Sequence, residues 1–141
     1  MSQENVEIVK AMSAALNVGD MDGALAGFAS DVEVRDLANG PDQPQVIRGT
    51  DQMKEVWALW LDAFDELHLD LEEVFDAGNA VVCKAHWIGR GTTSGMSIDV
   101  RQFDVFELRG GTIIRAVLGH KSKADALEAV GLSEQDAHAD S

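Results

Sequence analysis

The sequence has a single cysteine, two prolines and no apolar run approaching the ~20 residues that a membrane span needs. One cysteine excludes an internal disulfide, and within VVCKAHW we expect Cys83 to be a small buried residue without a catalytic role. The N-terminal residues, MSQENVEIVK, have neither the basic nor the apolar segment of a secretion signal. These absences predict a cytoplasmic protein that makes no membrane contact.

Basic residues are also scarce: 11 lysines and arginines stand against 25 aspartates and glutamates, which gives a formal net charge of −14. A nucleic-acid surface needs clustered basic side chains, so this balance argues against a nucleic-acid partner and against an anionic membrane. With 141 residues, 45% of them hydrophobic, the chain is long enough for one domain with its own core. We predict a single domain over residues 1–132, followed by a disordered acidic tail over 133–141.

Apolar residues recur at helical spacing in three segments of the first half of the chain and in one segment near its end. They predict helices over residues 4–18, 21–29 and 50–64, and over the segment KADALEAV. Asp20, Thr50 and Ser122 are suitable caps for the last three of these helices, and Gly131 is a suitable terminator for the final one. We expect the apolar side of residues 50–64 to face the core.

Alternating apolar and polar residues predict the strands of one sheet. They are expected at 32–37, 46–47, 67–71 and 80–88, with a turn at 76–79, and in the stretch 96–120, whose two strands meet at Arg109-Gly110-Gly111. Helices, then meandering strands, then a closing helix form an α+β pattern. We predict a cone-shaped, curved, mixed sheet, rich in antiparallel pairs, packed against the three helices of the N-terminal half, with a short C-terminal helix. Its open end would form a small-molecule pocket beside helices 4–18 and 50–64.

Two aspartates fall on strand faces that are otherwise apolar. Counting by twos from Met96 places Asp104 in line with Phe106, and the same count places Asp36 in line with Val34. An ionised, unpaired carboxylate on a buried face costs several kcal/mol. Asp104 is therefore paired, or neutral through a raised pKa, or turned outward by a bulge. The sequence leaves these three alternatives open.

Several common catalytic and cofactor motifs are absent. The chain has no G-x-x-x-x-G-K-[ST] phosphate loop, no G-x-G-x-x-G dinucleotide motif and no G-x-S-x-G nucleophile elbow. Its four histidines show neither H-x-x-x-H nor H-x-H spacing, which argues against a zinc site. We therefore predict no cofactor and no metal. What remains is the pair of aspartates, which can divide into a base and a neutral acid if their surroundings differ.

Three blocks of the sequence resemble the ketosteroid isomerase and SnoaL-like polyketide cyclase group, whose members share the nuclear-transport-factor-type cone. The blocks are AALNVGDMDGALAGF, then DVEVRD with a Pro/Gly loop and RGTDQMKEVW, and then FDVFELRGGTIIRAVLG. Their order and spacing extend over nearly the whole chain. The resemblance implies the cone fold and a homodimer packed through the outer sheet face, which the partly apolar strand 80–88 would permit.

The resemblance also implies a role for each acid. Asp36, in VRDL, falls where the isomerase has its general base, and Asp104, in FDVFEL, falls where it has a protonated aspartate that donates to the dienolate oxygen. The second oxyanion donor of the isomerase is a tyrosine on the first helix, where this chain has Met12, and the chain contains no tyrosine. The residues expected to bind a ligand are Met12, Phe28, Trp57, Trp60, Val100, Phe106 and Leu118.

Two functions of different classes follow from these residues. In the first, the protein is a cofactor-free isomerase or cyclase that moves a proton on a small, largely apolar carbonyl compound. In the second, the same pocket binds such a compound without catalysis. Both carboxyls at one closed apolar cavity would favour the first function, and a solvent-facing Asp104 would favour the second.

Overall fold

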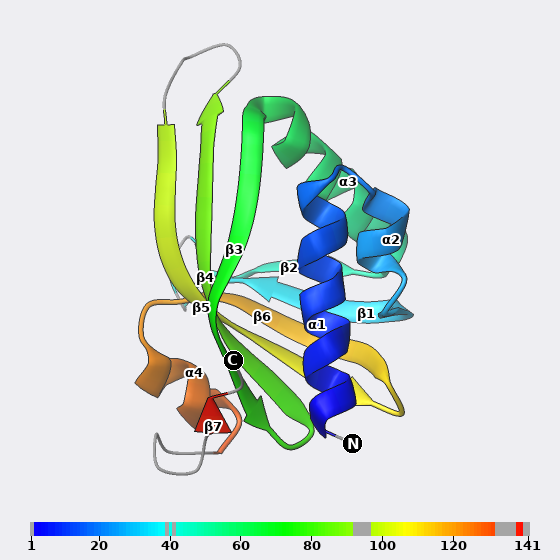
Figure 1. Cartoon of the computed structure of the whole chain (residues 1–141), viewed down its shortest axis with the longest axis vertical. Coiled ribbons are helices and arrows are strands. Elements are labelled where there is room, and N and C mark those ends of the chain that lie inside the picture. The colour runs from blue at the N-terminus through cyan, green and yellow to red at the C-terminus, as the bar shows by residue number, and fades with distance from the viewer. Residues whose placement is uncertain (1, 39, 41, 92–96, 132–137, 140–141) are drawn as a thin grey trace.

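The computed structural model describes residues 2–38, 40, 42–91, 97–131 and 138–139. Within these residues an α+β fold combines four helices with one seven-stranded sheet (Figure 1). None of the helices described is long and apolar enough to cross a membrane. In chain order the elements are α1 (Ser2–Asn17), α2 (Met21–Leu25), β1 (Phe28–Asp36), β2 (Gln45–Arg48), α3 (Thr50–Ala63), β3 (Phe64–Ala77), β4 (Ala80–Gly91), β5 (Ser97–Arg109), β6 (Thr112–His120), α4 (Lys123–Ala129) and β7 (His138–Ala139).

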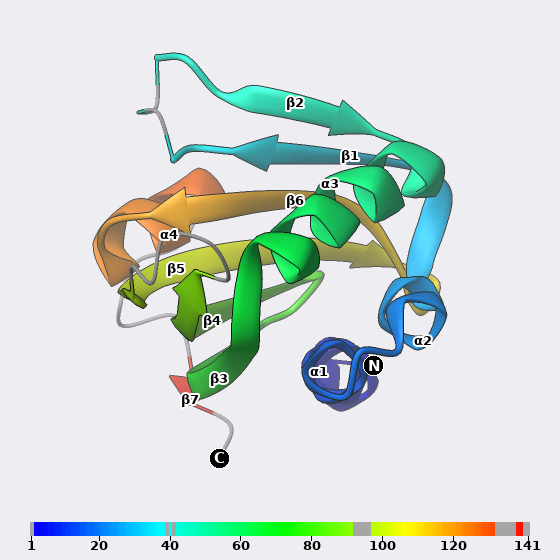
Figure 2. The ribbon, with the colours of Figure 1, turned by 90° about the horizontal axis from the view of Figure 1, so that it is seen from above.

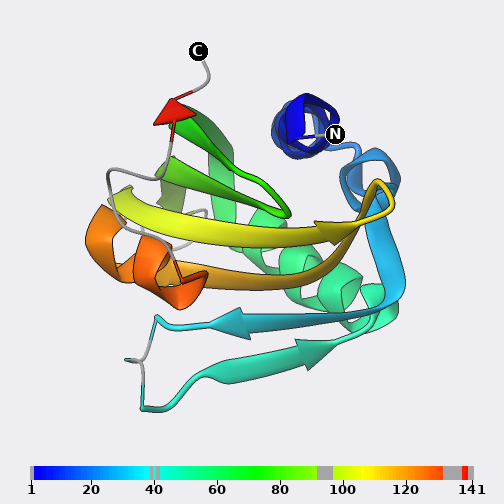
Figure 3. The same ribbon diagram turned by 90° about the horizontal axis from the view of Figure 1, so that it is seen from below.

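The sheet is curved, and its strands follow the order β2-β1-β6-β5-β4-β3-β7 (Figure 3). Neighbouring strands are antiparallel except for β1 and β6, which are parallel. The parallel pair sets Asp36 opposite Leu118, and the antiparallel pair of β5 and β6 sets Phe103 opposite His120. The end of β6 therefore lies between the end of β1 and the middle of β5, where Asp104 is found.

Alternation along each strand divides the sheet into two faces. On β4, Val81 and Cys83 point into the main core, which α1, α2 and α3 cover (Figure 2). Val82 points the other way and packs with Leu127 of α4 in a second, smaller core, on the side away from α1 (Figure 3). Burial raises the pKa of the Cys83 thiol well above its ordinary value. The predicted fold class is confirmed, and Cys83 is the buried residue that the sequence indicated.

The second helix is shorter than predicted. It ends at Leu25 instead of residue 29, and Phe28, which was expected on the helix, begins β1. The chain runs close to α1 at Gly27, where a Cβ would lie 2.9 Å from Cγ2 of Ile8. The Gly27 carbonyl also accepts a hydrogen bond of 2.8 Å from the N–H of Ile113. Close packing on α1 and pairing with β6 therefore draw the chain out of the helix and into the sheet.

The third helix lies across the hollow of the sheet and is less buried than predicted (Figure 2). On the side expected to face the core, Met53 is fully buried, whereas Trp60 is 42% exposed. The predicted cap at Thr50 is wrong, because Thr50 begins the helix and Gly49 takes the cap position without a side-chain hydrogen bond. The aromatic side of α3 therefore faces a space above the sheet.

β1, β2, β3 and β4 are longer than the sequence indicated, and β7 was not expected. β3 starts at Phe64, directly after α3, and β4 continues to Gly91. β7, over His138–Ala139 of the predicted tail, pairs with Phe75 and Asp76 at the edge of β3. Residues 92–96, predicted as a turn and the start of the next strand, lie outside the described residues, as do 133–137 and 140–141 of the tail.

Candidate active site

A cavity of about 200 Å³ lies between α3 and the inner face of the sheet. Its wall is mostly apolar, and the polar side chains on it are those of Asp36, at the end of β1, and Gln102, on β5. All three tryptophans of the chain, Trp57, Trp60 and Trp87, contribute to it. The other lining residues are Leu16, Ala38, Ile47, Val56, Leu61, Leu67, Ile98, Val100 and Leu118. An apolar wall with a few convergent polar groups is the usual form of a small-molecule site.

Ring contacts hold two of the three indoles in place. Trp57 packs edge to face on Phe28, with ring centroids 5.9 Å apart and planes at 89°. Trp60 stacks on Phe64, with centroids 5.7 Å apart and planes at 21°. Such contacts add to the free energy that the rings gain from burial. Two of the three indoles on the cavity wall are therefore held by neighbouring rings.

Asp36 stands at the cavity wall where β1 ends. Alternation along β1 buries Val32 and Val34 on the inner face and turns the Asp36 side chain the same way. Its Oδ1 accepts a hydrogen bond of 2.9 Å from the N–H of Ala38, which forms an Asx turn. The residue is half-buried, so both water and a ligand can reach its carboxyl group.

Asp104 is buried in the middle of β5, with only 4% of its surface exposed. Its Oδ1 accepts hydrogen bonds from the N–H of Gly119 and from Nε2 of Gln102, both at 2.9 Å. Burial raises the pKa of Asp104 to about 6, although the two hydrogen bonds act in the opposite direction. The pairing of β5 with β6 shifts register between Phe103 and Val105, yet the carboxyl stays inside. Of the three alternatives left open by the sequence, hydrogen bonding and a raised pKa both apply, and the outward turn does not.

Two consecutive residues of β6 connect the acids. The Leu118 carbonyl accepts a hydrogen bond of 2.8 Å from the N–H of Leu37, directly after Asp36, while the Gly119 N–H donates to Asp104. Gly119 has a φ of +96°, a backbone conformation that residues with side chains rarely adopt. After burial, the charge of Asp36 is a further cause of the raised pKa of Asp104. The charge of Asp36 therefore favours the neutral form of Asp104.

The structure brings part of the predicted residue set together at the cavity. Asp104 lies behind the wall, where it is bonded to Gln102. Met12, Phe28 and Phe106 belong to the surrounding core, where they are 4%, 6% and 3% exposed. The predicted residues that line the cavity are Asp36, Trp57, Trp60, Val100 and Leu118.

Nine of the fourteen lining residues were not in the predicted site, and three of these nine lie on β4 and β5. Gln102 and Ile98 have the same parity on β5 as Asp104, and Trp87 has the inward parity of Val81 on β4. The signal was therefore present in the alternation of the strands. It could not show how far along each strand the cavity extends, because that depends on where α3 crosses the sheet.

We expect Asp104→Asn to change how stability depends on pH. Between about pH 4 and pH 6 the folded protein holds a proton on Asp104 that the unfolded chain has released, so the parent protein loses stability as the pH rises. Above pH 6 the free energy of unfolding is about 3 kcal/mol lower than it is below pH 4. Asparagine has no such proton, so the variant should equal the parent near pH 4 and exceed it by about this amount near pH 8.

Urea unfolding of both proteins from pH 4 to pH 8 measures this difference. Asp31→Asn, at an exposed carboxyl earlier in the chain, is the matched control. Its stability should depend on pH in the same way as that of the parent. A stability difference between Asp104→Asn and the parent that stays constant over the window would contradict a raised pKa for Asp104.

Comparison with known families gives one match that covers most of the chain. The family model described as a SnoaL-like domain matches residues 9–116. No curated protein matches the chain.

Solved structures with the same fold extend this result. A protein with a ketosteroid isomerase-like fold from Catenulispora acidiphila, in complex with trimethylamine, has a TM-score of 0.71 at 22% identity, over 89% of this chain and 93% of the other. A protein from Jannaschia, provisionally named a SnoaL-like polyketide cyclase, has a TM-score of 0.72 at 22% identity, over 82% and 84%. TerC, co-crystallised with polyporic acid, has a TM-score of 0.70 at 20% identity, over 84% and 92%. At these identities the likeness is one of fold.

Proposed function

The chain belongs to the SnoaL-like domain family, and we propose that its cavity catalyses cofactor-free proton transfer on a small, largely apolar carbonyl compound, as an isomerase or a cyclase. The observation that carries this proposal is the pair of carboxyls in unlike surroundings. Asp36 lines the cavity within reach of water, whereas Asp104 is buried and has a pKa raised to about 6. Two such groups can serve one site as a base and a neutral acid.

Asp36 is the general base in this proposal. Its carboxylate removes a proton from the carbon next to the carbonyl group, and the electron pair of the broken C–H bond moves toward the carbonyl oxygen to give an enolate. In an isomerase the proton then returns to a different carbon. In a cyclase the enolate carbon attacks a second carbonyl group, whose C=O π bond breaks, and the resulting alkoxide oxygen takes the proton back from Asp36. The base must come within about 3 Å of the carbon that loses the proton, which a ligand in this cavity can satisfy because Asp36 lines it.

The enolate oxygen needs hydrogen-bond donors. The position of the helix tyrosine is occupied by Met12, which is buried in the core. Gln102 lines the cavity, and one N–H of its amide is used on Asp104 Oδ1 at 2.9 Å, which leaves the second for a ligand oxygen. Asp104 lies behind Gln102 and not on the cavity wall, so we propose that neutral Asp104 stabilises this oxygen together with Gln102, either directly or through the Gln102 amide.

The size and lining of the cavity support a small substrate. Its volume of about 200 Å³ is below the roughly 300–1,000 Å³ of pockets for drug-sized ligands. The lining is aromatic and aliphatic apart from Asp36 and Gln102. A compound with one ring and one carbonyl group fits these limits better than a large polycyclic one.

The alternative function is binding without catalysis, and one observation indicates a ligand for it. Trp57, Trp60 and Trp87 line the same cavity as the Asp36 carboxyl, and indole faces together with a carboxylate attract alkylammonium ions. One protein of this fold has been crystallised with trimethylamine. Under this alternative the cavity would hold a small methylated ammonium ion and the carboxyls would transfer no proton.

A solvent exchange experiment separates the two functions. The protein is incubated in D₂O with a panel of cyclic enones and cyclic ketones, and deuterium uptake at carbon is followed by NMR. Binding is measured in parallel by tryptophan fluorescence, which reports directly on the cavity because all three tryptophans line it. Catalysed exchange supports the enzyme, whereas saturable binding of enones or of trimethylammonium without exchange supports the binding module.

We also propose a cytoplasmic homodimer that packs through the outer sheet face, as the resemblance implies. Val82 is covered by α4 on this face, whereas Ile88 of the same strand is 40% exposed. The contact would therefore use the part of β4 that α4 leaves open. Sedimentation velocity at micromolar concentration tests the proposal, and a monomer would contradict it.

A further inference from the structure

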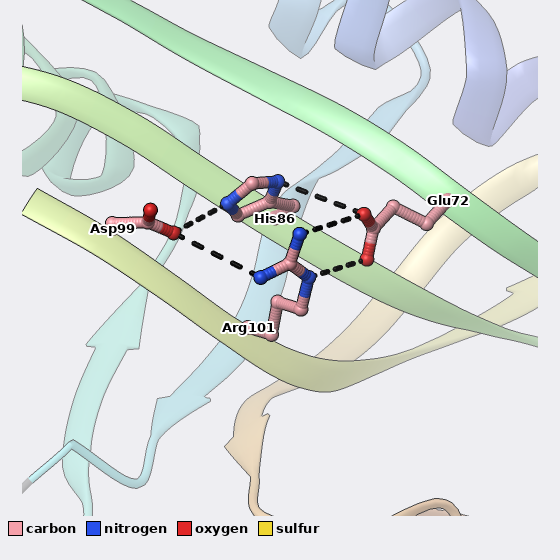
Figure 4. A network of polar contacts seen from close by, with 4 residues as sticks. All are labelled: Glu72, His86, Asp99 and Arg101. Carbon is pink, nitrogen blue, oxygen red and sulfur yellow. Dashed lines mark hydrogen bonds and ion pairs between the residues drawn. The ribbon is translucent and has the colours of Figure 1, made fainter.

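Figure 4 shows a network of charged side chains on the outer face of the sheet, on the other side from the cavity. His86 of β4 is 8% exposed and lies between two carboxyls. Its Nε2 is 2.5 Å from Oδ1 of Asp99 on β5, and its Nδ1 is 3.6 Å from Oε2 of Glu72 on β3. Asp70 of β3, which carries a third carboxyl group, lies opposite His86 in the register of β3 and β4. The imidazole therefore has carboxyl groups on both of its nitrogen sides.

Arg101 is the cation of this network. Its Nε donates to one oxygen of Glu72 at 2.9 Å and its Nη2 to the other at 3.2 Å, and its Nη1 lies 4.0 Å from Asp99. The hydrogen bond from Arg101 lowers the pKa of Glu72, so this carboxyl is ionised. About half of the Arg101 side chain is exposed, so it can turn toward solvent when another cation takes its place.

The three groups on the Glu72 side of the imidazole have the composition of a metal site. One oxygen each from Asp70 and Glu72 and one nitrogen of His86 all lie within 4.8 Å of one another. Bonds from zinc to such ligands are about 2 Å long, so ligand atoms around one ion lie within about 4 Å of each other. Small side-chain rotations would therefore close the set around an ion.

From this geometry we propose that Asp70, Glu72 and His86 bind a divalent transition-metal ion such as Zn²⁺ on the outer face of the sheet. An imidazole with two carboxylates favours Zn²⁺, Co²⁺, Ni²⁺ or Cu²⁺ over Mg²⁺, which prefers oxygen ligands alone. His86 Nδ1 is the ligand atom, because it faces Glu72. Asp99 accepts the proton of Nε2 and orients the ring, which is the usual arrangement behind a metal-bound histidine.

The charge of the protein supports a cation at this place. The chain has a net charge of −14, and the cluster places the carboxyls of Asp70, Glu72 and Asp99 around a single arginine. A negative field raises the local concentration of cations. Arg101 then acts as the internal competitor, and its removal should favour the metal ion.

Titration calorimetry with ZnCl₂ tests the proposal on the full chain. We expect one Zn²⁺ per protomer, and an absorption band from tetrahedral coordination when CoCl₂ is used instead. His86→Gln and Asp70→Asn should each weaken Zn²⁺ binding at least tenfold, since each removes a ligand. Asp99→Asn should weaken it about 10- to 100-fold and alter the Co²⁺ band, as expected for a positioning residue. Arg101→Gln should bind Zn²⁺ more tightly than the parent.

Two matched variants control for adventitious binding by surface groups. His68→Gln, at an exposed histidine of β3, and Glu73→Gln, at the exposed carboxyl next to Glu72, should both leave Zn²⁺ affinity unchanged. The proposal is overturned if Zn²⁺ and Mg²⁺ bind equally well, or if both His86→Gln and Asp70→Asn bind Zn²⁺ like the parent. Asp70 is exposed, so Asp70→Asn keeps the test valid even if His86→Gln does not fold.

Discussion

Asp36→Asn is expected to slow carbon-bound proton exchange by about 10²- to 10⁴-fold, the range that a positioned general base contributes. The asparagine amide fills the same space on the cavity wall but cannot accept a proton from carbon. The Ala38 N–H can still bond to the amide oxygen, so the end of β1 should keep its conformation. Deuterium uptake into the enone that the parent turns over best measures the effect.

The comparison needs a binding measurement and a charge control. Tryptophan fluorescence should give the same enone affinity for Asp36→Asn and for the parent, because the apolar wall is unchanged. Asp31→Asn removes an equal charge from an exposed position on the same strand and should exchange like the parent. If Asp36→Asn exchanges carbon-bound protons at the rate of the parent, Asp36 is not the general base.

The same variant separates the two ligand classes. A trimethylammonium ion held by the indoles and the Asp36 carboxylate would lose its ion pair, so its affinity should fall in Asp36→Asn. A neutral enone has no ion pair to lose. A loss of ammonium affinity in a protein that catalyses no exchange would therefore favour the binding module.

Much of the fold follows from patterns that are local in the sequence. The alternation of Val32, Val34 and Asp36 gave the orientation of β1, and the same counting put Asp104 on the inner face. Those predictions succeeded because the side-chain direction in a strand depends only on parity. The limits of β1 and α2 lie instead on either side of Gly27, where a Cβ would meet Ile8 of α1, and no local pattern contains this tertiary restriction.

The sequence could indicate a candidate site residue where its own position on a strand was unusual, but it could not show which residues of other strands lie beside it. The sequence marked Asp104 as unusual, but its hydrogen bond from Gly119 comes from a different strand, 15 residues further on. The network of Glu72, His86, Asp99 and Arg101 on the outer face of the sheet (Figure 4) was missed for the same reason. Histidine spacing detects ligands on one segment, whereas Glu72, His86 and Asp99 meet because three strands pair in a particular register.

Asp104→Ala is expected to reduce exchange by about 10²- to 10³-fold, the usual cost of losing one donor to a developing oxyanion. Asp104→Asn should retain most of the activity, because its amide still donates a hydrogen bond and its oxygen can still accept from Gly119 and Gln102. The rate constant kcat/KM of the parent should fall as the pH rises above about 6, since the neutral form of Asp104 is the proposed donor and is lost as the pH passes its raised pKa. The Asn variant has no proton to lose at this position, so its profile should lack this fall.

Gln102→Leu tests whether Asp104 acts directly or through its neighbour. If Gln102 is itself a donor, this variant loses activity to a similar degree as Asp104→Ala. It keeps a decline at high pH, moved upward because the Gln102 hydrogen bond no longer lowers the pKa of Asp104. Urea unfolding of each variant shows whether a loss of rate comes from the site or from the fold, since Asp104→Ala leaves the Gly119 N–H without its partner. Equal activity of Asp104→Ala and the parent, in proteins of comparable stability, would leave Asp104 with a structural role alone.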